Sequence, residues 1–226
     1  MAPFWDVDEE TNFVNLNNDI DKLGYKVYNV GTPQEQKQIA NVLAMSRKNI
    51  NLLLFYLIQN PEMWYNHPIA WGVIHTFDIH IPSWKRHYKL INSTNLSNQN
   101  ELSSLNDTVN KESMIIGPFY NMQEMTPNDH GILGLNKPKE IVNINGYPRA
   151  KRRSMHLTLR NIRKGNGNNY TCGPLYDYNR IMDLVIHELT HTTCNDIYWK
   201  EDNHLPPYGQ YHSMMRRWAR ECNIIN

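Results

Sequence analysis

The chain of 226 residues is long enough to bury a hydrophobic core, and its three cysteines are too few for a disulfide framework. With 23 Lys and Arg against 22 Asp and Glu, it has no overall charge that attracts nucleic acid or a membrane, so such binding requires a local patch. The acidic start MAPFWDVDEE and the lack of a long apolar run predict neither a signal peptide nor a membrane span, and hence an intracellular protein of the cytoplasm or nucleus.

The first 113 residues are expected to form a mainly helical region, although residues 1–31 show no clear period. Thr32 is a candidate N-cap, Pro33 suits the first helical position, and Glu35 completes a capping box. Apolar residues then recur at helical spacing up to Pro61, which predicts one long helix, or two in line, with one buried face. The residues of this face are Ile39, Val42, Leu43, Ile50, Leu53, Leu54, Leu57 and Ile58.

Four histidines follow among aromatic residues. They are His67, His75, His80 and His87, and their spacings of 8, 5 and 7 residues match no metal-ligand pattern, so we interpret them as core or surface histidines. Residues 92–113 are polar and low in complexity, which indicates a connection with at most one short helix. The sequence therefore predicts a division into residues 1–113 and residues 114–226.

The second region mixes strand and helix signals. In SMHLTLRN, Met155, Leu157 and Leu159 alternate with polar residues, which predicts a half-buried strand. A turn rich in Gly and Asn, KGNGNN, leads to a helix expected from about Tyr178 to about Cys194. Its predicted cap is Asp177, and its apolar stripe consists of Ile181, Leu184, Val185 and Leu189.

This helix carries the sequence HELTH, which has the pattern of a zinc peptidase. His187 and His191 lie one turn apart on one face, where both imidazoles can bind one Zn²⁺. Glu188 beside them can take a proton from water and pass it to a leaving amine. The alternatives are an amphipathic helix with two surface histidines, and a structural metal site that uses Cys194 and Cys222. The sequence lacks the closely spaced pairs of cysteines that are typical of structural metal sites.

A basic segment precedes the histidine helix. Seven Lys or Arg and no acidic residue lie between Arg149 and Lys164. The segment is a candidate nucleic-acid contact, and the alternative is a solvated charged face that protects an edge strand from aggregation. The candidate nucleic-acid residues are Arg149, Lys151, Arg152, Arg153, Arg163 and Lys164.

Three motifs together resemble the WLM family of zinc metalloproteases, which is related to the SprT and Spartan proteases. EMTPNDHGILGLNKPKEIVNING is similar to the family's opening segment with L-G-L-N, MHLTLRN to its strand ending in L-x-L-R, and YDYNRIMDLVIHELTH to its H-E-x-x-H helix. The resemblance covers about residues 121–226. It implies an α+β, zincin-like core with a small antiparallel sheet, bound Zn²⁺ and, as in eukaryotic members, proteolysis of proteins crosslinked to DNA.

The asparagine-rich composition is also similar to that of WLM-type sequences from large DNA viruses. This similarity makes a viral, virion-packaged protein a further expectation.

The third zinc ligand is expected to be His204. Twelve residues separate it from His191, which is closer to the spacing of Spartan-like members, where an aromatic follows four places after the ligand, as Tyr208 does here. His212 is the main rival, because YHSMMRRWARE looks helical, and Glu221 is a further alternative. The candidate donors to an oxyanion are Tyr208, Tyr211 and His212.

Two functions follow as expectations. The first is a zinc-dependent endopeptidase acting on protein substrates, with DNA as a further partner. The second is a catalytically retired nucleic-acid-binding or virion-associated structural protein with the same fold. A complete H-E-x-x-H favours the enzyme, because a retired site has no physical need for Glu188.

Overall fold

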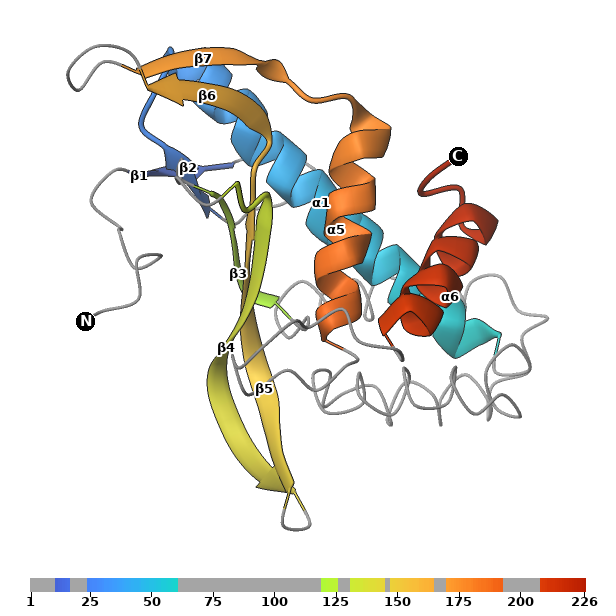
Figure 1. The fold of residues 1–226 in the computed structure, drawn as a ribbon. Coiled ribbons are helices and arrows are strands. Elements are labelled where there is room, and N and C mark those ends of the chain that lie inside the picture. Colours follow the sequence, from blue (N-terminus) through green and yellow to red (C-terminus); the bar gives the residue numbers. More distant parts are fainter. Residues whose placement is uncertain are drawn as a thin grey trace, which may run out of the picture.

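The computed structural model describes residues 11–16, 24–60, 119–125, 131–144, 147–164, 170–192 and 208–226. Within these ranges the chain is a mixed α+β protein, with three helices packed beside strands (Figure 1). The helices are α1 (Pro33–Gln59), α5 (Tyr178–His191) and α6 (Tyr208–Glu221). The strands are β1 (Thr11–Asn15), β2 (Gly24–Tyr28), β3 (Phe119–Glu124), β4 (Gly134–Ile144), β5 (Tyr147–Leu157), β6 (Arg160–Lys164) and β7 (Tyr170–Leu175).

Five strands form one mixed sheet in the order β1-β2-β3-β5-β4, and β6 pairs with β7 in a separate antiparallel hairpin. The pairs β1–β2 and β4–β5 are antiparallel, whereas β2–β3 and β3–β5 are parallel. The expectation of a small antiparallel sheet was therefore wrong in this respect. The parallel pairs arise because β3 enters the sheet through long connections rather than through hairpins.

Strand β5 is only partly enclosed by its neighbours. Its residues from Arg153 to Leu157 pair with β3, and along its whole length it pairs with β4. The part before Arg153 therefore belongs to a two-stranded ribbon, which extends beyond β3 in Figure 1. Strand β4 is an edge of the sheet and lies against α5.

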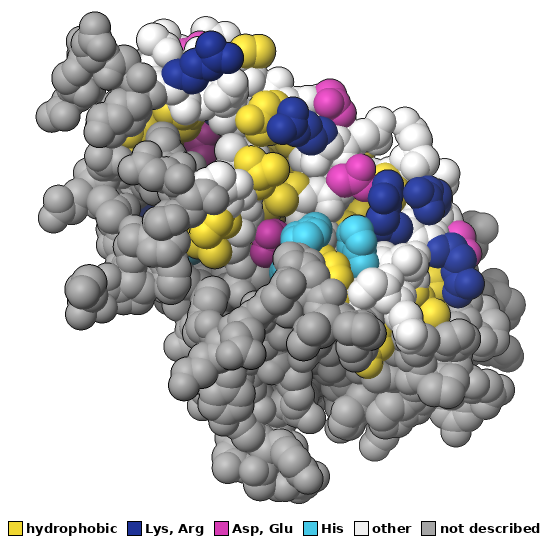
Figure 2. All heavy atoms as spheres, in the orientation of Figure 1, with side chains coloured by type: hydrophobic (Ala, Val, Ile, Leu, Met, Phe, Trp, Pro, Cys, Tyr) yellow, Lys and Arg dark blue, Asp and Glu magenta, His cyan; other side chains and the backbone are white. Residues whose placement is uncertain are grey.

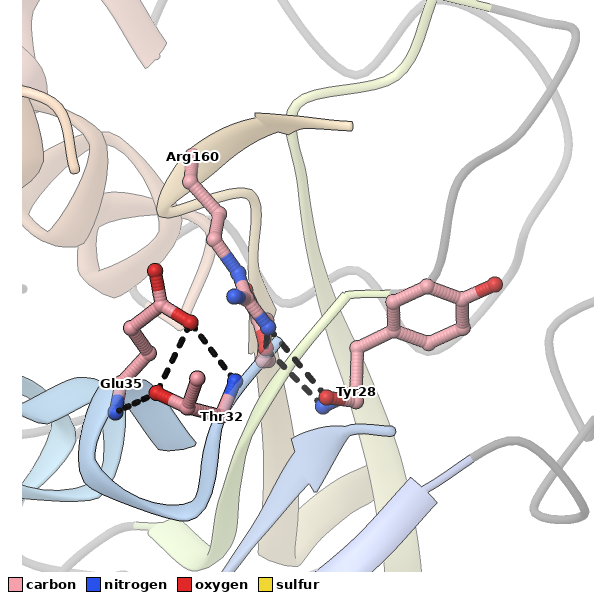
Figure 3. Close-up of polar contacts among 5 residues, drawn as sticks. Tyr28, Thr32, Glu35 and Arg160 are labelled. Carbon is pink, nitrogen blue, oxygen red and sulfur yellow. Dashed lines mark hydrogen bonds and ion pairs between the residues drawn. The ribbon is translucent and has the colours of Figure 1, made fainter. Parts of the chain in front are cut away.

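Helix α1 is a single helix and begins as its sequence predicts. The Thr32 Oγ1 atom accepts from the Glu35 backbone N–H at 3.3 Å, and the Glu35 carboxylate accepts from the Thr32 N–H at 2.6 Å, which is a complete capping box (Figure 3). These bonds from Thr32 lower the pKa of Glu35. None of the helices in the described part of the chain combines the length and hydrophobicity of a membrane-crossing helix.

One hydrophobic core joins residues from both ends of the sequence. Val27 of β2, Leu43 of α1, Met155 of β5, Val185 of α5 and Trp218 of α6 are all fully buried in the same cluster. The division expected near residue 113, the connection at 92–113 and the four histidines at 67–87 lie outside the described residues. On either side of that segment, β2 and β3 belong to the same sheet.

The segment SMHLTLRN, predicted to be one half-buried strand, forms the end of β5 and the start of β6, and the prediction was wrong for the burial of two of its polar residues. Met155, Leu157 and Leu159 are buried as predicted, but His156 and Arg160 are buried as well. His156 is accommodated by hydrogen bonds, with Nε2 at 2.8 Å from Ser154 Oγ and Nδ1 at 3.1 Å from Gln123 Nε2. An interior strand has partners on both sides, so it can bury a polar side chain that these partners satisfy.

Arg160 is buried in an ion pair that connects three strands. Its Nε donates to Glu124 Oε1 at 2.8 Å and its Nη2 to Glu124 Oε2 at 3.1 Å. The Nη2 atom also donates to the Tyr28 carbonyl at 3.2 Å (Figure 3). The Tyr28 N–H in turn donates to Glu124 Oε2 at 2.9 Å. The ion pair of Glu124 and Arg160, with its bonds to the Tyr28 backbone, thus connects β2, β3 and β6.

Candidate metal and catalytic site

Helix α5 positions the H-E-x-x-H residues. It begins at Tyr178, as predicted, with Asp177 as N-cap accepting from the Arg180 N–H at 3.0 Å. It ends at His191 rather than near Cys194, and Cys194 lies outside the described residues. The buried stripe of Ile181, Val185 and Leu189 fixes the rotation of the helix, so the two histidines emerge together at one edge of this stripe.

The two histidines bring their ring nitrogens together. His187 Nε2 lies 3.3 Å from His191 Nε2, and the ring centroids are 5.0 Å apart. Two nitrogens bound to one tetrahedral Zn²⁺ at about 2.0–2.1 Å would be separated by about 3.3 Å. The same separation suits an N–H···N hydrogen bond between neutral imidazoles, so the pair fits zinc without requiring it. Histidine side chains gather over α5 and α6, beside hydrophobic and acidic ones (Figure 2).

Glu188 lies beside the histidines in a nearly closed environment, with 4% of its surface exposed. Its carboxylate is pressed against the start of β4: a Cβ atom added to Gly134 would lie 2.3 Å from Glu188 Oε1. This low exposure shields the Glu188 carboxylate from bulk water, which suits a group that carries a proton.

Asn136 is a residue of this site that sequence reasoning did not single out. Its Nδ2 donates to the backbone carbonyl of Glu188 and, at 3.0 Å, to Thr192 Oγ1. The Asn belongs to the L-G-L-N stretch, so the motif was visible in the sequence. Its contact with a helix 52 residues further along was not visible, because no local pattern encodes it.

Helix α6 brings two further candidate residues to the histidines. The Tyr208 hydroxyl donates to the His187 carbonyl at 3.2 Å, and the Tyr208 ring lies 4.7 Å from the His191 ring. His212 stacks on Tyr208 at 5.6 Å, and its ring is 5.7 Å from that of His187. An ion pair at 3.1 Å between Asp183 and Arg216 also connects α5 to α6. Tyr211 packs against the core.

Among the described residues, which include His212, no three His, Cys, Asp or Glu side chains are arranged to hold a metal ion. Glu221 is at the other end of α6, where its carboxylate accepts from the Tyr56 hydroxyl at 3.3 Å. His204 lies outside the described residues, so its assignment as the third ligand stays a prediction.

The six basic residues proposed to contact nucleic acid fall into two groups. Arg149, Lys151, Arg152 and Arg153 lie on β5, mostly in the two-stranded ribbon, and Arg163 and Lys164 lie on β6. Figure 1 shows the start of β5 and the hairpin of β6 and β7 at opposite ends of the molecule. The structure therefore does not join the two groups in one patch. Of the six, the Arg163 side chain is described and is exposed.

Comparison with known proteins gives no assignment: no family model, no curated protein and no solved structure matches this chain. The resemblance to the WLM family therefore rests on the three sequence motifs alone. Function has to be argued from the site residues themselves.

Proposed function

We propose that the protein is a zinc-dependent endopeptidase of the WLM type with a zincin-like core. The observation that carries the proposal is the 3.3 Å separation of His187 Nε2 and His191 Nε2 beside the nearly buried Glu188. His204 is the proposed third ligand. When bound, Zn²⁺ would lower the pKa of a water molecule and polarise the peptide carbonyl, which is the chemistry that hydrolysis of an amide needs.

Glu188 is the proposed proton carrier. As the water oxygen bonds to the peptide carbonyl carbon, the carboxylate accepts a proton from that water. It then delivers the proton to the amine nitrogen as the C–N bond breaks, so the products are a carboxylate and an amine. Its enclosure keeps bulk water from competing for this proton.

His212 is the better-placed candidate donor to the developing oxyanion. The Tyr208 hydroxyl already donates to the His187 carbonyl, so Tyr208 is better suited to hold the His187 backbone and to pack against His191. His212 faces the same cluster from the next turn of α6, with its ring 5.7 Å from His187. A donor aimed at this position would stabilise negative charge on the carbonyl oxygen.

Metal analysis combined with a proteolysis assay tests this proposal. Glu188→Gln should keep zinc and the fold but lose peptide hydrolysis by at least ~10²-fold, because it removes the proton carrier and leaves the ligands in place. Elemental analysis of the purified protein measures zinc, and cleavage of an unfolded protein substrate measures activity. A fully active Glu188→Gln variant, or a wild-type chain that neither binds zinc nor cleaves, would refute the proposal.

The same experiment assigns the third ligand. His204→Ala should lower zinc content and activity together, since a ligand is lost. His212→Ala should keep zinc and only slow the reaction, and it is the matched control because it removes a nearby imidazole. Full zinc content in the His204 variant with loss in the His212 variant would reverse the assignment.

A second candidate function is nucleic-acid binding, either by an active protease that cleaves DNA-bound proteins or by a retired structural protein. It is favoured by the backbone of β5, which carries Arg149, Lys151 and Arg152 on a two-stranded ribbon beyond β3. Among the described strands, none pairs with the outer edges of this ribbon, and two-stranded ribbons of this kind can enter a groove of DNA. A complete H-E-x-x-H favours the active protease over the retired protein, because a retired site has no physical need for Glu188.

A further inference from the structure

Gly134, the first residue of β4, has no room for a side chain. A Cβ atom there would lie 2.3 Å from Glu188 Oε1, 2.8 Å from its Cδ and 2.9 Å from its Cγ. The backbone itself does not demand glycine, because Gly134 is not among the residues with positive φ. The glycine is therefore explained by the space that the Glu188 carboxylate occupies.

Asn136 lies two residues further along β4 and thus on the same face of the strand. The Glu188 carbonyl is one of the last four of α5, and the Thr192 N–H that would complete the helical pattern bonds instead to the carbonyls of Leu189 and Thr190. The Asn136 amide donates to the Glu188 carbonyl and also to Thr192 Oγ1. Asn136 therefore connects β4 to the last turn of α5 at Glu188, the residue next to His187.

We propose that Gly134 and Asn136 are positioning residues for Glu188. Gly134 leaves the space in which the carboxylate lies, and Asn136 fixes the backbone that carries it. The inference rests on the proposed function, because it assigns both residues to the proton carrier of that reaction. Neither residue touches the substrate or the metal in this assignment.

A single methyl group at residue 134 tests the proposal. In Gly134→Ala the overlap falls on the flexible end of Glu188, so the carboxylate should be displaced while both histidines stay in place. A displacement of about 1 Å in a catalytic group lowers the rate by about 10²-fold, so we expect kcat to fall by that factor with KM and zinc content unchanged. The matched control is Gly209→Ala in α6, where a Cβ would meet no atom within 4 Å.

The effect should also depend on Glu188. In the Glu188→Gln background, whose proton carrier is already lost, Gly134→Ala should lower the residual rate no further. An equal further loss in that background, or full activity of Gly134→Ala, would overturn the proposal.

Asn136→Asp, which keeps the size of the side chain but replaces the donor by an acceptor, should lower kcat as much as Asn136→Ala. Full activity of the Asp variant would remove Asn136 from the assignment.

A measurement on the zinc-free protein separates this inference from the proposed function. Gly134→Ala should lower the Tm of the wild-type chain, but it should cause no such loss in a Glu188→Ala background, where the carboxylate is absent. If Gly134→Ala alone does not fold, the double variant Gly134→Ala with Glu188→Ala should fold, because the carboxylate that the methyl group would overlap is absent. An equal loss of Tm in both backgrounds would overturn the steric contact. If the contact holds but the wild type neither binds zinc nor cleaves, the positioning role fails together with the proposed function.

Discussion

The Cys222 thiol follows the last residue of α6 and is partly buried. Burial raises its pKa to about 12, and the neighbouring Glu221 charge acts in the same direction. Only the thiolate reacts with alkylating reagents, so at pH 8 the reactive fraction is reduced by about 10³ relative to an ordinary cysteine. Cys222 is therefore expected to react slowly as a nucleophile.

We expect iodoacetamide at pH 8 to modify Cys222 at least ~10²-fold more slowly in the folded protein than in urea. Mass spectrometry of the peptide that contains Cys222 follows the reaction. Cys172, whose pKa is also raised chiefly by burial, should be slowed as well and serves as an internal comparison. Equal rates for Cys222 in the folded and unfolded chain would contradict the expectation.

Among the elements, the buried pair of Glu124 and Arg160 connects β3 to β6 and holds Tyr28 of β2. Glu124→Ala leaves the Arg160 guanidinium buried without its carboxylate, which should lower the free energy of unfolding by about 3–5 kcal/mol. Urea denaturation measures this loss. Replacing both residues by apolar ones, Glu124→Leu with Arg160→Met, should recover most of it, because no buried charge then remains. If the double variant is less stable than Glu124→Ala, the pair contributes more than charge compensation.

The elements that the sequence predicted well are those with local signals. The cap at Thr32 and the cap at Asp177 depend on residues three positions apart, so α1 and α5 could be placed to within a residue at their starts. The mixed sheet could not be predicted, because β2 pairs with β3 across a long stretch of sequence. For the same reason the burial of Arg160 was missed, since its partner Glu124 is 36 residues away.

The candidate site likewise contains residues that a local pattern predicts and residues that only the tertiary structure brings together. His187, Glu188 and His191 share one helix, and the 3.6-residue period alone predicts that both imidazoles lie on one face. The roles of Gly134 and Asn136 depend on how β4 docks against α5, which no pattern within either segment specifies. His204 was inferred from spacing within a family resemblance and stays a prediction.

At the scale of the whole molecule, the start of β5 and the hairpin of β6 and β7 lie at opposite ends, so the two groups of basic residues can be tested separately (Figure 1). If β5 binds single-stranded DNA, neutralising Arg152 and Arg153 should weaken binding at every sequence, and the magnitude of the slope of log K against log salt should decrease by about 1.4. Fluorescence anisotropy with a labelled oligonucleotide at several salt concentrations measures both quantities.

Neutralising Arg163 and Lys164 removes the same charge from the other end and is the matched control for that experiment. A smaller effect of this pair locates binding at β5. Equal effects of the two pairs would show a response to net charge alone, and no binding at 50 mM salt would leave the β5 residues as a solvated surface.

The pairing of β2 with β3 also affects how the chain reaches its fold during synthesis. Tyr28 and Glu124 are 96 residues apart, and a ribosome that adds about 5–20 residues per second takes roughly 5–20 s to make that interval. Until β3 emerges, β2 presents an unpaired edge, and such an edge can pair with neighbouring chains on the same messenger RNA. We therefore expect the nascent protein to be open to this pairing throughout the interval, and a slower rate of translation would lengthen it.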